Sequence, residues 1–149
     1  MAWLKCLGRK PDKTVSINQS TPLTYYEGST WGANPAYISQ TINCSGYKYA
    51  YVDCELSVRK QYNNTAGGVS NTIYVGIGNT SHITALGTVS GAPSGGGTPS
   101  SYPSGRLTRK IDISDLSGNQ QVLGYQGKYD WDGAIDGTLT VYQIRLSDY

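Results

Sequence analysis

Phenylalanine is absent from this sequence, histidine and methionine occur once each, and charged residues make up only 15% of the 149 positions. With His82 as the only histidine, a zinc site or a Ser/His/Asp triad would depend on one residue, which we expect at the surface. The glycine-rich stretches lack the lysine and the strand-to-helix context of a phosphate-binding loop. These absences argue against an enzyme.

Long apolar runs are also missing. No stretch approaches the length of a membrane-spanning segment, and MAWLKCLGRK is interrupted by charge too soon for a secretory signal. We therefore expect neither membrane insertion nor a signal peptide.

The few charges are unevenly placed. Residues 1–13 hold four basic groups and one acidic group, which leaves eight basic and nine acidic groups for the rest, with a net charge of +2. The nearly neutral body offers no basic stripe for phosphates, so nucleic acid is not an expected partner. Residues 1–14 predict a basic N-terminal arm that is solvated or docked on an assembly partner.

Cysteine occurs three times. Cys44 and Cys54 are separated by ten residues of extended chain at about 3.3 Å each, which is too far for a disulfide. We expect Cys54 in the core and Cys6 as a free thiol in the arm, in keeping with synthesis in a reducing cytoplasm.

The sequence does contain a long two-residue alternation, from Tyr47 to Tyr62. A helix, with about 3.6 residues per turn, cannot use this pattern, whereas a half-buried strand needs it. The apolar side consists of Ala50, Val52, Cys54, Leu56 and Val58, and the outward side consists of Tyr49, Tyr51, Asp53, Glu55, Ser57 and Arg59. We therefore predict one long strand with an apolar face on a core.

Shorter strand patterns surround this segment, with turn residues between them and no helix of useful length. Together with the long strand they lie at 15–17, 36–43, 47–62, 72–78, 81–89, 107–114, 121–129 and 138–146. About eight short strands at this spacing predict an all-β fold, an antiparallel β-sandwich of the jelly-roll type. We expect residues 15–149 to form this sandwich as a single domain.

Several connections can also be predicted. Pro22 limits the first strand, and the segment 63–68 suits a hairpin turn that returns 72–78 beside the long strand. Residues 90–105, rich in Gly, Ser and Pro, predict a mobile surface loop. The last strand has apolar residues at both odd and even positions, which is typical of a strand shielded on both sides.

The segments SGYKYAYVDCEL, IDISDLSGNQQVLGY and GTLTVYQIRLSD resemble galactose-binding-like jelly-roll modules of phage virion and tail-associated proteins, a fold shared with carbohydrate-binding modules. The resemblance covers about residues 36–149. It implies a non-enzymatic virion or prophage protein, made in the bacterial cytoplasm, whose partners are other virion proteins, further copies of itself in a homo-oligomer, or cell-surface glycan. It assigns no binding role to any single residue.

Loop aromatics are the candidate ligand-binding residues. Tyr25, Tyr26 and Trp31 share one loop, while Trp131 follows Tyr129 in another. Sugars present C–H faces that stack on flat rings, and Tyr and Trp combine an apolar body with a polar group. The alternatives are that these rings cap the ends of the sandwich, and that the outward face of the long strand is the contact surface.

An acidic turn is the candidate metal site. Asp130, Asp132 and Asp136 are spaced as D-x-D-G-x-x-D, and short Asp/Gly loops can supply several of the oxygens that calcium requires. The alternative is that these residues serve turn geometry. No other cofactor is expected. Two functions remain open: a structural virion component of a phage tail or fibre, and a carbohydrate-binding module.

Overall fold

The computed structural model of the chain describes residues 10–24, 35–65 and 69–149, and within these ranges it contains eight strands and no helix. The strands are β1 (Lys13–Leu23), β2 (Ala36–Asn43), β3 (Tyr49–Gln61), β4 (Ser70–Ile77), β5 (Ile83–Ser90), β6 (Arg106–Asp112), β7 (Asn119–Gln126) and β8 (Ile135–Ser147). None of the described segments is a helix that could cross a membrane.

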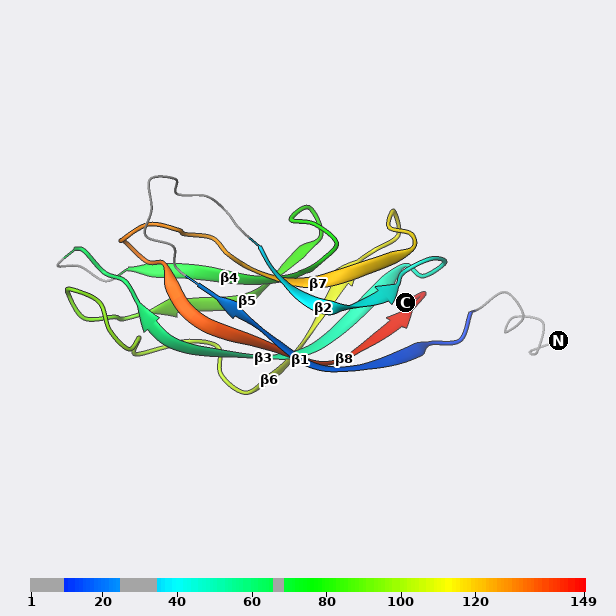
Figure 1. Cartoon of the computed structure of the whole chain (residues 1–149), viewed down its shortest axis with the longest axis horizontal. Coiled ribbons are helices and arrows are strands. Elements are labelled where there is room, and N and C mark those ends of the chain that lie inside the picture. The colour runs from blue at the N-terminus through cyan, green and yellow to red at the C-terminus, as the bar shows by residue number, and fades with distance from the viewer. Residues whose placement is uncertain (1–9, 25–34, 66–68) are drawn as a thin grey trace.

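The strands form two antiparallel four-stranded sheets, which are the two layers of Figure 1. Sheet A has the order β1-β8-β3-β6 and sheet B the order β2-β7-β4-β5. Thus β1 pairs with β8, β2 with β7, β3 with β6 and β4 with β5, as if one long hairpin had been rolled up. This nesting is the jelly-roll arrangement, so the predicted fold class is confirmed.

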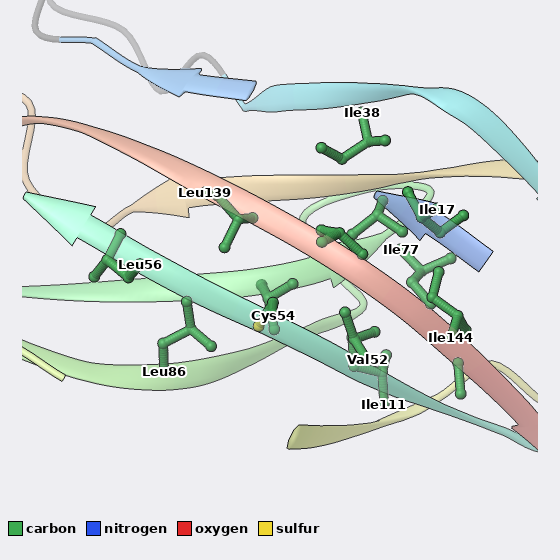
Figure 2. Packing of buried hydrophobic residues seen from close by; sticks show 14 of the residues in the cluster. Ile17, Ile38, Val52, Cys54, Leu56, Ile77, Leu86, Ile111, Leu139 and Ile144 are labelled. Carbon is green, nitrogen blue, oxygen red and sulfur yellow. The ribbon is translucent and has the colours of Figure 1, made fainter. Parts of the chain in front are cut away.

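The long strand β3 lies in the interior of sheet A, between β8 and β6. Its predicted inward residues are all buried: the exposed fractions are 0% for Ala50, Val52 and Cys54, 2% for Leu56 and 6% for Val58. They pack against residues of the facing sheet such as Ile77 and Leu86 (Figure 2). The two-residue alternation therefore identified the central element of the core.

The predicted partner of the long strand was wrong. β3 pairs with β6 and β8, whereas β4 pairs with β5 and β7 in the other sheet. The chain after β3 therefore crosses from sheet A to sheet B instead of making a hairpin within one sheet. In a jelly roll the partners of an inner strand come from distant parts of the sequence, which local turn residues do not reveal.

The first strand is longer than predicted and runs through Pro22, which pairs with Thr138 of β8. Proline is tolerated here because β1 is an edge strand, whose outer side needs no hydrogen-bond donor. A β-bulge interrupts β1 between Ser16 and Gln19, with Asn18 at a φ of 51°. The strand begins at Lys13, so the last residues of the predicted arm belong to the sandwich.

A bulge in β8 explains its unusual pattern. Asp53 of β3 pairs with Gln143, but the next residue, Cys54, pairs with Val141, so Tyr142 is an extra residue in β8. The inward positions change parity there: the apolar residues with an exposed fraction of 0% are Ile135, Leu139 and Val141 before the bulge and Ile144 and Leu146 after it. The prediction of a strand shielded on both sides was therefore wrong; one inward face with a bulge produces the same sequence pattern.

Side chains close both open sides of the sandwich. On one side Arg109 of β6 donates to the backbone carbonyls of Ala85 and Leu86 in β5, each at 2.9 Å. On the other side the backbone N–H of Gln40 in β2 donates to Gln19 Oε1 in β1 at 3.0 Å, and Gln40 Nε2 donates to the carbonyl of Ser16 at the same distance. At both sides, polar side chains therefore make hydrogen bonds between an edge strand of one sheet and an edge strand of the other.

The Gly/Ser/Pro loop at 90–105 has defined contacts. The buried side chain of Gln61 donates to the carbonyl of Val89 at 3.1 Å and accepts from the N–H of Ala92 at 3.3 Å. The backbone of Gln61 also exchanges two hydrogen bonds with Gly97, at 2.8 and 2.9 Å. The last residue of β3 therefore anchors the first half of this loop.

Both cysteines that the structure describes, Cys44 and Cys54, are buried free thiols; the core position of Cys54 was predicted, whereas that of Cys44 was not. Burial raises the pKa of Cys44 to about 11 and that of Cys54 to about 12. Each is therefore a neutral side chain of the core.

Candidate functional site

Two loops meet at one end of the sandwich: the segment 62–65 after β3 and the turn 127–134 between β7 and β8. The N–H of Tyr62 donates to the carbonyl of Ala134 at 2.8 Å, and the N–H of Gly133 donates to the carbonyl of Tyr62 at 2.9 Å. The N–H of Asn64 donates to Asp132 Oδ1 at 3.1 Å. These bonds fix the turn that carries Trp131.

Trp131 is the most prominent residue of this end. Its side chain is among the few large exposed hydrophobic ones in the described residues, with 39% of the residue accessible. The ring of Tyr62 meets it edge to face, with 5.8 Å between ring centres and an angle of 84° between planes. An exposed indole is therefore held in place by a second aromatic ring.

A line of polar contacts leads from this aromatic pair onto sheet A. The hydroxyl of Tyr62 donates to Asp136 Oδ2 at 3.0 Å, and Arg59 Nη2 donates to the same oxygen at 3.1 Å. The Arg59 side chain is 78% exposed and that of Asp136 is 15% exposed. We call Arg59, Tyr62, Trp131 and Asp136 the Trp131 site.

A groove of about 430 Å³ adjoins the Trp131 site on the outer face of sheet A. It crosses three neighbouring strands and is lined by Pro22, Leu23, Thr24, Ser57, Arg59, Asp136, Gly137 and Thr138. Gly137 is required there, because a Cβ atom at this position would collide with the carbonyl oxygen of Ser57. The lining thus combines hydroxyl groups with one guanidinium and one carboxylate.

This arrangement suits the binding of a polar ligand that has an apolar face. The hydroxyls can donate or accept hydrogen bonds, Arg59 donates and Asp136 accepts. Trp131 provides a flat apolar surface beside them.

Of the predicted ligand-binding residues, Tyr25, Tyr26 and Trp31 lie outside the described residues. Tyr129 packs on Tyr125 with 5.6 Å between ring centres, and Tyr125 packs on Tyr74 at 6.1 Å. The Tyr129 hydroxyl is buried and has no hydrogen-bond partner in the described part of the chain, and burial raises its pKa. This hydroxyl is not placed to meet a ligand at the surface.

The three predicted calcium ligands have separate partners. Asp130 Oδ1 accepts from the N–H of Asp132 at 3.0 Å, Asp132 accepts from Asn64, and Asp136 accepts from Arg59 and Tyr62. Across residues 10–24, 35–65 and 69–149, no group of three or more His, Cys, Asp or Glu side chains could hold a metal ion. The geometry therefore provides no cluster of carboxylates for calcium at this turn.

The outward face of β3 is occupied by contacts within the protein. Cationic groups lie over three tyrosine rings, at 3.9 Å for Lys110 on Tyr49, 4.0 Å for Arg145 on Tyr51 and 4.0 Å for Arg106 on Tyr142. Arg106 also pairs with Asp53 at 2.5 Å, and the hydroxyl of Tyr142 donates to Glu55 at 2.6 Å. The polar groups of this face are thus largely engaged with one another.

His82 lies at the surface but is largely covered by its neighbours, with 13% of its side chain exposed. Its Nδ1 lies 2.8 Å from Asn79 Oδ1, and its Nε2 lies 2.7 Å from Asp115 Oδ1. These contacts join the β4–β5 turn to the segment between β6 and β7. The role supported for His82 is structural.

Sequence reasoning missed Arg59, Tyr62 and the groove. The alternation did place Arg59 on the outward side of the long strand, and Tyr62 closes the same segment. The sequence did not indicate that either residue lies near Trp131, because the neighbour of β3 in this region is β8. Arg59 and Asp136, which form an ion pair there, are 77 residues apart in the chain.

No protein-family model matches the chain, and no curated protein matches it. Among solved structures it is similar to the CBM36-1 domain of a multidomain xylanase from the hindgut metagenome of Trinervitermes trinervoides, with 16% identity over 92% of this chain and 97% of that one and a TM-score of 0.34. It is also similar to CBM28, a carbohydrate-binding module specific for non-crystalline cellulose, with 13% identity, 87% and 74% coverage and a TM-score of 0.37.

A third similar structure is that of infectious bursal disease virus, Gx strain, with 14% identity and a TM-score of 0.34; the match covers 93% of this chain but only 32% of the viral one. At these scores we take nothing about ligand or activity from any of these proteins.

Proposed function

We propose that the protein is a non-enzymatic glycan-binding module and that it binds its ligand at the Trp131 site and the adjoining groove. The observation that carries this proposal is the exposed Trp131 ring, braced by Tyr62 and linked through Asp136 and Arg59 to a polar groove. A sugar ring needs an apolar platform and nearby hydrogen-bonding groups, and this end of the sandwich supplies both.

The ligand makes two kinds of contact with the protein. One sugar ring stacks with its C–H face on Trp131, where water is displaced from two apolar surfaces. A neighbouring sugar unit lies in the groove, where Ser57, Thr138 and the Arg59–Asp136 pair replace the hydrogen bonds that its hydroxyls made with water. Because Tyr62 packs against Trp131 and its hydroxyl reaches Asp136 at the groove, one sugar ring does not fill both positions, and the preferred ligand is longer than a monosaccharide.

The strands that carry these groups make the site rigid. Arg59 lies at a β-bulge of β3, between Val58, which pairs with Gly137 of β8, and Lys60, which pairs with Asp136. The turn of Trp131 is tied to Tyr62 by two backbone hydrogen bonds. Little side-chain or loop freedom is lost when a ligand binds to a site that is already ordered, which favours affinity.

A glycan array tests the proposal, with the wild-type protein compared with W131A and Y37A. Tyr37 is the matched control, since it is 41% exposed, close to the 39% of Trp131, but belongs to β2 in the other sheet. We expect W131A to weaken binding of the array ligands at least about tenfold, the loss typical of a central aromatic anchor, and Y37A to leave it unchanged. Absence of binding to every glycan, or equal losses in both variants, contradicts the proposal.

A further inference from the structure

We propose that the groove beside Arg59 recognises an anionic group of the glycan, a carboxylate or a phosphate carried by one sugar unit. This inference rests on the proposed function and names the class of ligand. It follows from which member of the Arg59–Asp136 pair a ligand can reach.

The two partners of this ion pair differ in accessibility. The Arg59 side chain is 78% exposed, whereas that of Asp136 is 15% exposed and its Oδ2 atom already accepts hydrogen bonds from Arg59 and Tyr62. A ligand in the groove therefore meets much more of the guanidinium than of the carboxylate.

Arg59 also has unused donors. Its Nη2 atom binds Asp136, and within the described part of the chain no hydrogen bond involves its Nε or Nη1. A guanidinium presents several N–H groups in one plane, the geometry that carboxylate and phosphate oxygens match. Asp136 holds the Arg59 side chain, which lines the groove.

The neighbouring charges support this assignment. Lys60 places its ammonium group 4.5 Å from the centre of the Tyr62 ring, so a second cation lies at the same end of β3. The acidic residues of the Trp131 turn accept hydrogen bonds from backbone N–H groups. Asp132 accepts from the N–H of Asn64 at 3.1 Å, and Asp130 accepts from the N–H of Asp132 at 3.0 Å. The anionic unit therefore belongs in the groove and an uncharged part of the ligand on Trp131.

Three ligands and two variants test the proposal by isothermal titration calorimetry. The ligands are a uronic-acid oligosaccharide, the same oligosaccharide with its carboxylates methyl-esterified, and a sugar-phosphate oligomer. The variants are R59Q and R106Q. Arg106 is the matched control because it is 57% exposed, pairs with an aspartate on the same sheet and does not line the groove.

We expect the wild-type protein to bind at least one anionic ligand at least about tenfold more tightly than the methyl ester, as a charge-assisted hydrogen bond predicts. R59Q should abolish this preference, and R106Q should retain it. Whether uronate or phosphate is preferred identifies the anionic group.

Four results overturn the proposal. If the ester binds as tightly as the acid, or the preference survives in R59Q, the groove does not select for negative charge, although the glycan-binding function stands. If only uncharged glycans bind and W131A removes that binding, this inference alone fails. If no glycan binds at all, the proposed function fails with it.

Discussion

Arg109 in β6 donates from Nη2 to the backbone carbonyl of Leu86 in β5 at 2.9 Å, across the gap between the two sheets. Its Nε atom donates to the carbonyl of Ala85 at the same distance. One side chain of sheet A therefore satisfies two backbone acceptors of sheet B. We expect this crossing to stabilise the sandwich at the side where β5 and β6 are both edge strands.

R109Q should lower the free energy of unfolding by about 2 kcal/mol, since two hydrogen bonds of a charged donor are lost, one of them to the carbonyl of the buried Leu86. Urea denaturation followed by circular dichroism measures the change. R106Q, on the same strand, removes an exposed ion pair and should cost less than about 1 kcal/mol. Equal effects of the two substitutions would contradict the role assigned to Arg109.

Gln61 gives a prediction about the loop at 90–105. Q61L keeps much of the volume but leaves the carbonyl of Val89 and the N–H of Ala92 without this partner, which should destabilise the protein by about 2 kcal/mol or more. Hydrogen exchange should accelerate in residues 92–97. The exposed Gln143 provides the control, and Q143L should change stability by less than about 0.5 kcal/mol. Unchanged exchange in the loop would show that Gln61 does not anchor it.

The buried thiols should be unreactive in the native protein. Burial raises the pKa of Cys44 to about 11 and of Cys54 to about 12, so at pH 8 neither forms an appreciable fraction of the nucleophilic thiolate. In a C6S variant, a thiol reagent such as DTNB should react with neither cysteine until urea unfolds the chain. Rapid reaction without denaturant would mean that one of the two residues is accessible.

Asp112 gives a prediction about acid stability. Hydrogen bonds from Ser114, from the side chain at 2.6 Å and from the backbone at 2.9 Å, lower the pKa of this carboxyl group. A carboxyl whose pKa is lower in the folded state contributes stability above its unfolded pKa of about 4, and this is lost as pH falls through the lower folded pKa.

S114A removes the side-chain bond, so its Tm should fall below that of the wild type at pH 7, and the difference should shrink at pH 2. Thermal unfolding at both pH values measures this change. In a D112N background the S114A effect should not depend on pH. A pH-independent loss in the wild-type background would assign the role of Ser114 to packing.

The sandwich itself could be predicted from the alternation of apolar and polar residues, because a strand that is buried on one face has an apolar residue at every second position. The strand Ala36–Asn43 was predicted with its bounds as observed, and its two isoleucines, Ile38 and Ile42, are buried. The pattern misled where one extra residue, Tyr142, shifts the parity of β8, since a bulge and a doubly covered strand give similar sequences.

The site depended on pairings that no local pattern contains. Trp131 could be singled out as a loop aromatic, but its contact with Tyr62 and the Arg59–Asp136 pair require that β3 lie beside β8. The virion role, the homo-oligomer and the other virion partners stay predictions, which the molecular mass of the protein in solution would begin to test.

The most direct test of glycan binding at the Trp131 site is a titration of ¹⁵N-labelled protein with the strongest array ligand, followed by NMR. The Trp131 indole resonance is identified by its loss in W131F. We predict saturable shifts of this resonance and of the amides of Ser57, Gly137 and Thr138 along the groove. A ligand that binds while these signals stay unchanged, with shifts around Tyr37 on the opposite sheet instead, would contradict the account.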